Sequence, residues 1–381
     1  PVRMLHDAIS ATAYAGARLG ARTVPAAAGA IAAETGTPST EAYGDTPRGH
    51  FTLSALNGFW GDRLAEDRAA LAPVLSLRTS NGRLRRMPGN VAHDAAADTP
   101  TATGKLVVFL HGLCESDRYW GYGAQRCWGD PRTTYGTLLQ RDRSWTPLYG
   151  HYNTGLHISE NGRLLAGYLQ TLVDEWPVPV TEIALIGHSM GGLVARSAAH
   201  RADDHRLAWR AALRHIVGLG VPHLGAPLER WVNAGTHAMA RLPETKPLAT
   251  WLNQRSVGIK DLRYGSIVEA DWFGIDPDER LMDRCSPATL LDGVAYSMVS
   301  ATLSERSEGR FAHDLLVEHL SAHGTGRPNA VRRIEFEVDR LAHVGRRTHF
   351  HLLNDQVVYD RIRSWLDGAD GAAGPLAEGI G

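Results

Sequence analysis

Lysine, cysteine and long apolar runs are scarce in this chain of 381 residues, and each shortage narrows what the protein can be. Only three lysines occur, so arginine supplies nearly all the basic side chains, and the formal net charge is −1. A chain without excess positive charge has little means of neutralising the phosphates of a nucleic acid. We therefore expect no nucleic-acid partner.

The three cysteines, Cys114, Cys127 and Cys285, are too few for a disulfide framework, and none forms a C-x-x-C pair. A reduced chain is the simpler interpretation, although an exported protein could bridge Cys114 to Cys127 and leave Cys285 single. No apolar run reaches the roughly 18 residues that span a bilayer. Arginines interrupt the alanine-rich N-terminal stretch where a signal peptide needs continuous apolar sequence. We expect a cytoplasmic protein with no transmembrane segment, and export stays open.

A composition of 43% hydrophobic and 21% charged residues allows a large core in one α/β domain with insertions. We expect an N-terminal helical extension over residues 1–72, a main domain over 73–367 and a flexible tail over 368–381. The extension is expected to pack on the main domain. A homodimer contact or a membrane-surface contact through it is the alternative.

Strand and helix patterns alternate along the main domain. Leu106–Leu110 is continuously apolar, as a strand covered on both faces requires, and Asn81-Gly82 between two short strand patterns predicts a hairpin. This order predicts a mostly parallel sheet with helices on both faces. Further strands are expected near Trp145–Tyr149, His215–Gly220 and Val294–Val299, with an edge strand at Ile334–Asp339 and helices at Asn161–Trp176 and Val357–Leu366.

Residues 223–287 are irregular and contain several tryptophans, and they follow a predicted strand whose carboxyl end should lie at the ligand-binding edge of the sheet. We interpret them as a helical cap that walls an apolar acyl pocket. Ordinary core helices are the alternative. The candidate pocket residues are Trp231, Leu242 and Trp251.

The most specific pattern is Gly187-His188-Ser189-Met190-Gly191, where an apolar strand pattern ends and a helical pattern begins. A serine between glycines at such a turn is a nucleophile elbow, G-x-S-x-G. The helix that starts at Met190 directs an N–H and its positive dipole end toward the place where an oxyanion would form. Ser189 is therefore the candidate nucleophile.

A serine hydroxyl needs an imidazole to take its proton and a carboxylate to orient that imidazole. The expected chain order is elbow, acid and then histidine, each on a loop after a strand. Asp314 is the candidate acid, because the apolar Leu315-Leu316-Val317 should anchor its loop. His349 is the candidate base, because it leads directly into the last helix. The alternatives are Glu305 and Glu308 for the acid, and His343 and His351 for the base.

A second oxyanion donor is expected where His111-Gly112-Leu113 follows the strand Leu106–Leu110. The Leu113 N–H is the candidate, together with that of Met190, and each such donor contributes about 10²–10³ in rate. No zinc-type spacing or EF-hand loop accompanies the histidines or the aspartates of the predicted cap. We expect no metal and no cofactor.

Four segments occur together: the elbow, the His111-Gly112-Leu113 loop, Gly220–Glu229 and His349–Leu353. On the basis of these segments, roughly residues 105–367 resemble the bacterial α/β-hydrolase lipases and esterases. The resemblance is strongest to the group similar to the GPI inositol-deacylase lipases. The resemblance implies an α/β-hydrolase fold with a catalytic triad of Ser189, Asp314 and His349.

The chain departs from the commonest acid motif of these proteins, Gly-Asp or Ser-Asp-Gly, because His313 precedes Asp314 and no glycine follows it. The predicted function is cleavage of a small-molecule or lipid carboxylic ester through an acyl-enzyme. One alternative is an acyltransferase or thioesterase with the same triad. Another is a catalytically silent binding protein with the same fold.

Overall fold

The computed structural model of the protein describes residues 47–67, 71–79, 84–86, 102–226, 255–276, 285–286, 288–307, 312–326 and 332–368. Most of the predicted extension, much of the predicted cap and nearly all of the predicted tail lie outside these ranges. So do the three candidate pocket residues, Trp231, Leu242 and Trp251. The domain boundaries and the acyl pocket therefore stay predictions.

Within the described residues, one eight-stranded sheet carries the fold, in the order β2-β1-β4-β3-β5-β6-β7-β8. The strands from β4 to β8 in this order run parallel, whereas β1 is antiparallel to both β2 and β4. The predicted mostly parallel sheet and the pairing of its first two strands are confirmed. The strands are β1 (Ser76–Thr79), β2 (Leu84–Arg86), β3 (Lys105–Leu110), β4 (Thr146–His151), β5 (Glu182–His188), β6 (Leu213–Leu219), β7 (Ala295–Ala301) and β8 (Leu341–Val344).

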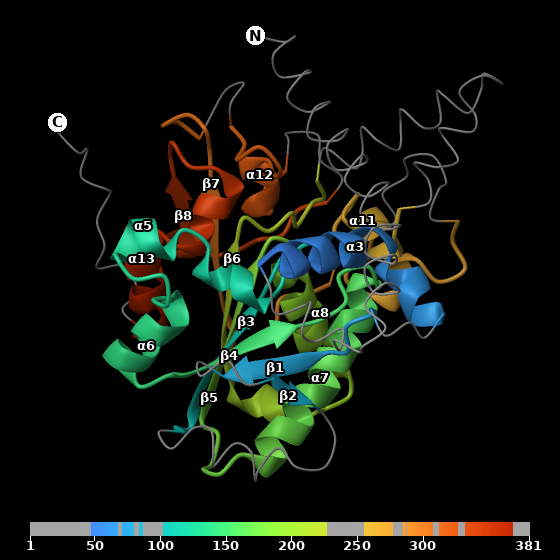
Figure 1. Cartoon of the computed structure of the whole chain (residues 1–381), viewed down its shortest axis with the longest axis horizontal. Coiled ribbons are helices and arrows are strands. Elements are labelled where there is room, and N and C mark those ends of the chain that lie inside the picture. The colour runs from blue at the N-terminus through green and yellow to red at the C-terminus, as the bar shows by residue number, and fades with distance from the viewer. Residues whose placement is uncertain are drawn as a thin grey trace.

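Helices cover both faces of the sheet, and Figure 1 shows α7 and α8 together on one side with α6 and α13 on the other. On β3, Leu106 and Val108 belong to the core shared with α7 and α8, whereas Val107 and Phe109 belong to the core shared with α6 and α13. Burial in both directions explains why the sequence of β3 is apolar without alternation. These helices are α6 (Tyr135–Arg143), α7 (Ile158–Glu175), α8 (Met190–Asp204) and α13 (Gln356–Leu366).

The remaining helical elements lie before the sheet or in the connections between its strands. Helix α3 ends at Glu66, before β1 begins at Ser76, so it is a separate element of the predicted extension. The remaining elements are α3 (Pro47–Glu66), η1 (Asp117–Gly121), α5 (Ala124–Trp128), η2 (Ala208–Ala212), α11 (Val257–Asp261), η3 (Glu269–Asp271), α12 (His319–Ala322), η4 (Val338–Arg340) and η5 (His349–Leu353).

The predicted edge strand at Ile334–Asp339 is wrong, because residues 332–337 are irregular and the edge strand is β8. The Phe336 N–H donates to the Ile334 carbonyl rather than to a neighbouring strand. Phe336 is buried beside the rings of His223 and Tyr296, with ring centroids 5.0 and 6.2 Å away. The apolar alternation therefore comes from a loop whose side chains enter the core.

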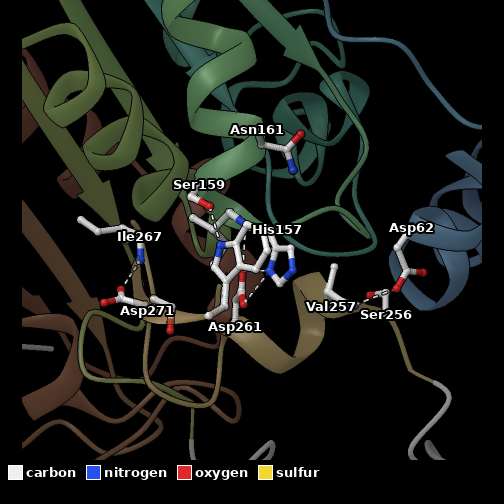
Figure 2. A network of polar contacts seen from close by, with 12 residues as sticks. Asp62, His157, Ser159, Asn161, Ser256, Val257, Asp261, Ile267 and Asp271 are labelled. Carbon is white, nitrogen blue, oxygen red and sulfur yellow. Dashed lines mark hydrogen bonds and ion pairs between the residues drawn. The ribbon is translucent and has the colours of Figure 1, made fainter. Parts of the chain in front are cut away.

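Part of the predicted N-terminal extension contacts part of the predicted cap. On α3, the Asp62 carboxylate accepts the Val257 N–H at 3.0 Å, at the first turn of α11 (Figure 2). The Ser256 hydroxyl donates to the Gly58 carbonyl at 2.6 Å. These contacts join α3 to α11, so two regions that are far apart in sequence support each other.

The cap region also holds the start of α7. Asp261 accepts the Ile158 N–H at 2.9 Å and lies 3.1 Å from the His157 imidazole (Figure 2). The Trp272 ring stacks on His157 at 3.7 Å, and its indole N–H donates to the Ser159 hydroxyl at 2.8 Å. A tryptophan of the predicted cap is therefore packed on the main domain.

All three cysteines, Cys114, Cys127 and Cys285, are free thiols. The alternative bridge between Cys114 and Cys127 is not formed, in agreement with the reduced chain that their number suggests. Among the described residues, no helix has both the length and the apolar character needed to cross a membrane.

Gly191 marks the closest approach of α8 to the end of β3. A Cβ built on it would lie 2.2 Å from the Leu110 carbonyl oxygen and 2.6 Å from that of His111. Backbone atoms cannot move aside as a flexible side chain can, so Gly191→Ala should lower the free energy of unfolding by about 3 kcal/mol. Denaturant unfolding followed by circular dichroism measures this change.

Gly167→Ala on α7 is the matched control, because nothing lies within 4 Å of a Cβ built at that position. Alanine there should raise the free energy of unfolding by about 0.5–1 kcal/mol, since glycine inside a helix carries an entropic cost. Similar effects of the two substitutions would contradict the steric explanation.

Candidate active site

Ser189 is the single residue between β5, which ends at His188, and α8, which begins at Met190. Its φ of 53° and ψ of −124° are strained for a residue with a Cβ. Glycines make the sharp turn feasible, because a Cβ on Gly187 would lie 2.2 Å from the Gly192 nitrogen. The backbone thus has the strand-to-helix turn that the G-x-S-x-G pattern predicts, with the serine at its apex.

The loop after β3 lies against this turn, since a Cβ on Gly112 would lie 3.0 Å from the Ser189 Cβ. The Tyr152 hydroxyl donates to the His111 carbonyl, and the two rings stack with centroids 4.2 Å apart. The Gly112 N–H donates to the Glu115 carboxylate at 2.7 Å. These contacts fix the loop beside the serine.

Asp314 is buried in the loop after β7, and both of its carboxylate oxygens have partners. Oδ1 accepts the N–H groups of Leu316 at 3.0 Å and Val317 at 2.8 Å, and Oδ2 lies 2.6 Å from His349 Nδ1. The expected apolar anchoring of this loop is correct for Val317, which is buried, and wrong for Leu315 and Leu316, which are exposed. Hydrogen bonds to Asp314 hold the loop instead.

Leu315 has a φ of 93°, in the left-handed region that favours glycine. This is the position after the acid, which is a glycine in the Ser-Asp-Gly form of the acid motif. A leucine is strained in this conformation.

His349 is buried, and its two ring nitrogens have different surroundings. Nδ1 faces Asp314, whereas Nε2 is buried without a hydrogen-bond partner in the described part of the chain. The His349 N–H donates to the Asp314 carbonyl at 3.0 Å, and Leu352 and Leu353 that follow are fully buried. Both the ring and its backbone are thus fixed, with Nε2 left open as an acceptor in the neutral ring.

Burial alone would lower the pKa of the His349 imidazole, because it disfavours the charged form. The charge and the hydrogen bond of Asp314 outweigh burial, and the charge of Glu115 adds to them, so this pKa lies above its usual value. Burial would likewise raise the pKa of Asp314. His349 and the two backbone N–H donors hold the pKa of that carboxyl below its usual value.

The end of β6 brings the serine and the histidine to one place. The Ser189 N–H donates to the Leu219 carbonyl at 2.9 Å. Gly220, with a φ of 60°, faces the His349 ring, because a Cβ built on it would lie 3.0 Å from Cε1 and Nδ1. Ser189 and His349 therefore both border the Leu219-Gly220 segment.

The candidate oxyanion donors come from two sides of the serine. Met190 is the first residue of α8, where a backbone N–H has no partner within its helix. On the loop after β3, Glu115 already accepts the Gly112 N–H. The next amide of that loop is Leu113, the residue chosen from sequence.

The structure separates Asp314 from the other candidate acids. Glu305 is exposed and pairs with Arg346 at 2.8 Å, and Glu308 lies outside the described residues. Of the described candidates, only Asp314 contacts a ring nitrogen of His349.

The other candidate histidines are engaged elsewhere. His343 Nε2 lies 2.7 Å from the Thr302 hydroxyl. His351 Nδ1 accepts the Thr348 N–H at 3.1 Å and lies 2.7 Å from the hydroxyl of the same residue, so its ring turns toward its own backbone. Of the three candidate histidines, His349 is the one whose ring faces a buried carboxylate.

Two residues of the site were not singled out by sequence reasoning. Glu115 and His188 are buried next to Ser189, and His188 Nδ1 lies 3.0 Å from the Glu115 carboxylate. The signal in the sequence was a carboxylate three residues beyond Gly112, directly after a buried strand. A glutamate in a loop is ordinarily solvated, so its spacing alone did not indicate burial.

Residues 101–278 match the family model described as the PGAP1-like alpha/beta domain. The matched segment contains the loop after β3, Ser189 and most of the predicted cap. It ends before Asp314 and His349. Over this segment the chain is therefore similar to an alpha/beta domain family, in agreement with the resemblance seen in the sequence.

Several solved structures are similar to the chain. The mature form of Bacillus licheniformis lipase BlEst2 has 16% sequence identity and a TM-score of 0.39, with 69% of this chain and 91% of that chain covered. Staphylococcus hyicus lipase has 13% identity and a TM-score of 0.40, with 70% and 95% covered. Bacillus subtilis carboxylesterase CesB (YbfK) has 14% identity and a TM-score of 0.34, with 69% and 84% covered.

Asp314→Asn should lower the pKa of His349, because it removes the negative charge that stabilises the imidazolium and leaves burial to act against it. The expected fall is about 1–3 pKa units, the usual effect of an opposite charge at this distance. An NMR titration of the histidine ring protons measures it. His351, which does not contact Asp314, is the internal control, and an unchanged His349 pKa would contradict the assigned pairing.

Proposed function

We propose that the protein is a serine hydrolase that cleaves carboxylic esters through an acyl-enzyme. The observation that carries the proposal is the His349 ring, held by Asp314 at Nδ1, 2.6 Å away, with a buried Nε2 that has no partner among the described residues. Acyl transfer to a serine requires a base oriented at one nitrogen and open at the other. The elbow serine on the same edge of the sheet supplies the nucleophile.

In the first half-reaction, His349 Nε2 takes the proton of the Ser189 hydroxyl while Oγ attacks the ester carbonyl carbon. The carbonyl electron pair moves to oxygen, and the oxyanion accepts hydrogen bonds from the Leu113 and Met190 N–H groups. When the intermediate collapses, the alcohol leaves with the proton from His349, and the acyl group stays on Ser189. Asp314 stabilises the imidazolium throughout.

In the second half-reaction, water replaces the serine hydroxyl as the nucleophile. His349 removes a proton from the water as its oxygen attacks the acyl carbon, and the same two N–H groups donate hydrogen bonds to the second oxyanion. Collapse returns the proton to Ser189 Oγ and releases the carboxylic acid. The cycle uses neither a metal nor a cofactor.

The surroundings of the two triad loops support an apolar ester as substrate. Leu315 and Leu316 are exposed directly after Asp314, and Phe350 is exposed directly after His349, with its ring 5.8 Å from the imidazole. Apolar acyl groups gain about 0.8 kcal/mol for each buried methylene. A small-molecule or lipid ester with an aliphatic acyl chain fits these surroundings.

Ser189→Ala should lower kcat by about 10⁶, and His349→Ala should be comparably severe, because the triad acts as a unit. His351→Ala is the matched control and should change kcat by less than about tenfold, since its ring bonds to Thr348 in its own turn and not, among the described residues, to Asp314. The measurement is kcat and KM for a chain-length series of p-nitrophenyl esters. Substantial turnover by the purified Ser189→Ala variant, or a larger loss from His351→Ala than from His349→Ala, would contradict the proposal.

A further inference from the structure

Glu115 and His188 form a second buried histidine–carboxylate pair beside the triad. His188 is 0% exposed and Glu115 is 5% exposed. His188 Nδ1 lies 3.0 Å from each of the two Glu115 carboxylate oxygens. The proposed hydrolysis uses neither side chain, so the burial of two ionisable groups calls for another role.

The hydrogen-bond partners of His188 determine which of its two ring nitrogens carry protons. Its Nε2 lies 3.2 Å from the His349 carbonyl oxygen, which can only accept a hydrogen bond. Its Nδ1 faces the Glu115 carboxylate. Burial by itself would raise the pKa of Glu115, but His188 and the Gly112 N–H hold it below its usual value, in favour of the ionised acid. Both bonds then form only if both ring nitrogens of His188 carry protons.

This pair contacts three parts of the candidate site. Glu115 accepts the Gly112 N–H at 2.7 Å, and a Cβ on Gly112 would lie 3.0 Å from the Ser189 Cβ. His188 precedes the serine in the chain. Its ring lies against that of His349, with centroids 4.5 Å apart, and its Nε2 bonds to the backbone of His349.

We propose that Glu115 and a doubly protonated His188 are positioning residues. They hold the loop after β3 and the proposed catalytic base, His349, in place on either side of Ser189. This role rests on the proposed ester hydrolysis. Glu115 fixes the amide of Gly112, next to the Leu113 N–H that is proposed as an oxyanion donor, and His188 fixes the His349 backbone. Neither side chain exchanges a proton with substrate, because both are buried and both ring nitrogens of His188 already have hydrogen-bond partners.

Glu115→Gln and Glu115→Ala separate this role from simple packing. In Glu115→Gln the amide oxygen can accept the Gly112 N–H, and the amide nitrogen can donate to a neutral His188 whose Nε2–H still reaches His349. In Glu115→Ala these links are lost. We expect Glu115→Ala to lower kcat by about 10²-fold with KM changed less than about threefold, as misplaced catalytic groups do. Glu115→Gln should restore kcat to within about fivefold of the wild type.

A wild-type kcat in Glu115→Ala, a loss expressed only in KM, or equal losses in both variants would overturn the proposal. The wild-type protein supplies a second test that does not depend on the stability of a variant. In ¹⁵N-histidine NMR at neutral pH, both ring nitrogens of His188 should be protonated, with His188→Gln used to assign the signals. A singly protonated His188 ring would overturn the ion pair.

The two proposals fail in different ways. If the wild-type protein neither hydrolyses p-nitrophenyl esters nor reacts with a fluorophosphonate probe at Ser189, the proposed function fails, and the NMR result still tests the ion pair. If the wild type is active and Glu115→Ala is equally active, the positioning role fails and the proposed function stands.

Discussion

The close contact between the first turn of α8 and the ends of β3 and β5 is the constraint on which the site depends. Gly187 and Gly191 permit it, because any side chain at either position would collide with backbone atoms. The contact forces Ser189 into its strained conformation and places the helix N-terminus beside the loop after β3. Strain at one residue is thereby maintained by the packing of three elements, as is common where a side chain must be presented for chemistry.

Two buried histidine–carboxylate pairs lie on either side of this turn, and they differ in what the histidine does with its second nitrogen. His349 pairs with Asp314 and keeps Nε2 open, whereas His188 pairs with Glu115 and its Nε2 bonds to a carbonyl. The first arrangement leaves an acceptor for a proton. The second has no open position and can only hold structure. Under the two proposals, the same pair of residue types serves chemistry or positioning according to its surroundings.

Local signals made much of this structure predictable. The G-x-S-x-G turn needs only neighbouring residues, and the order of acid and histidine follows from the order of strands in the sheet. The apolar run of β3 was predictable because both of its faces are buried. Burial that depends on residues far away in the sequence was not predictable from such local signals. Glu115 is buried by a partner 73 residues away, and Phe336 alternates with polar residues in a loop that enters the core rather than in a strand.

The central claim is that an acyl group passes through Ser189. The most direct test is to quench the protein with acid during turnover of a p-nitrophenyl ester, digest it, and measure the mass of the peptide that contains Ser189. The account predicts that this peptide carries the acyl group of the substrate, and that the adduct decays once the ester is consumed. Sustained turnover with an unmodified Ser189 peptide, or with the acyl group on another residue, would contradict it.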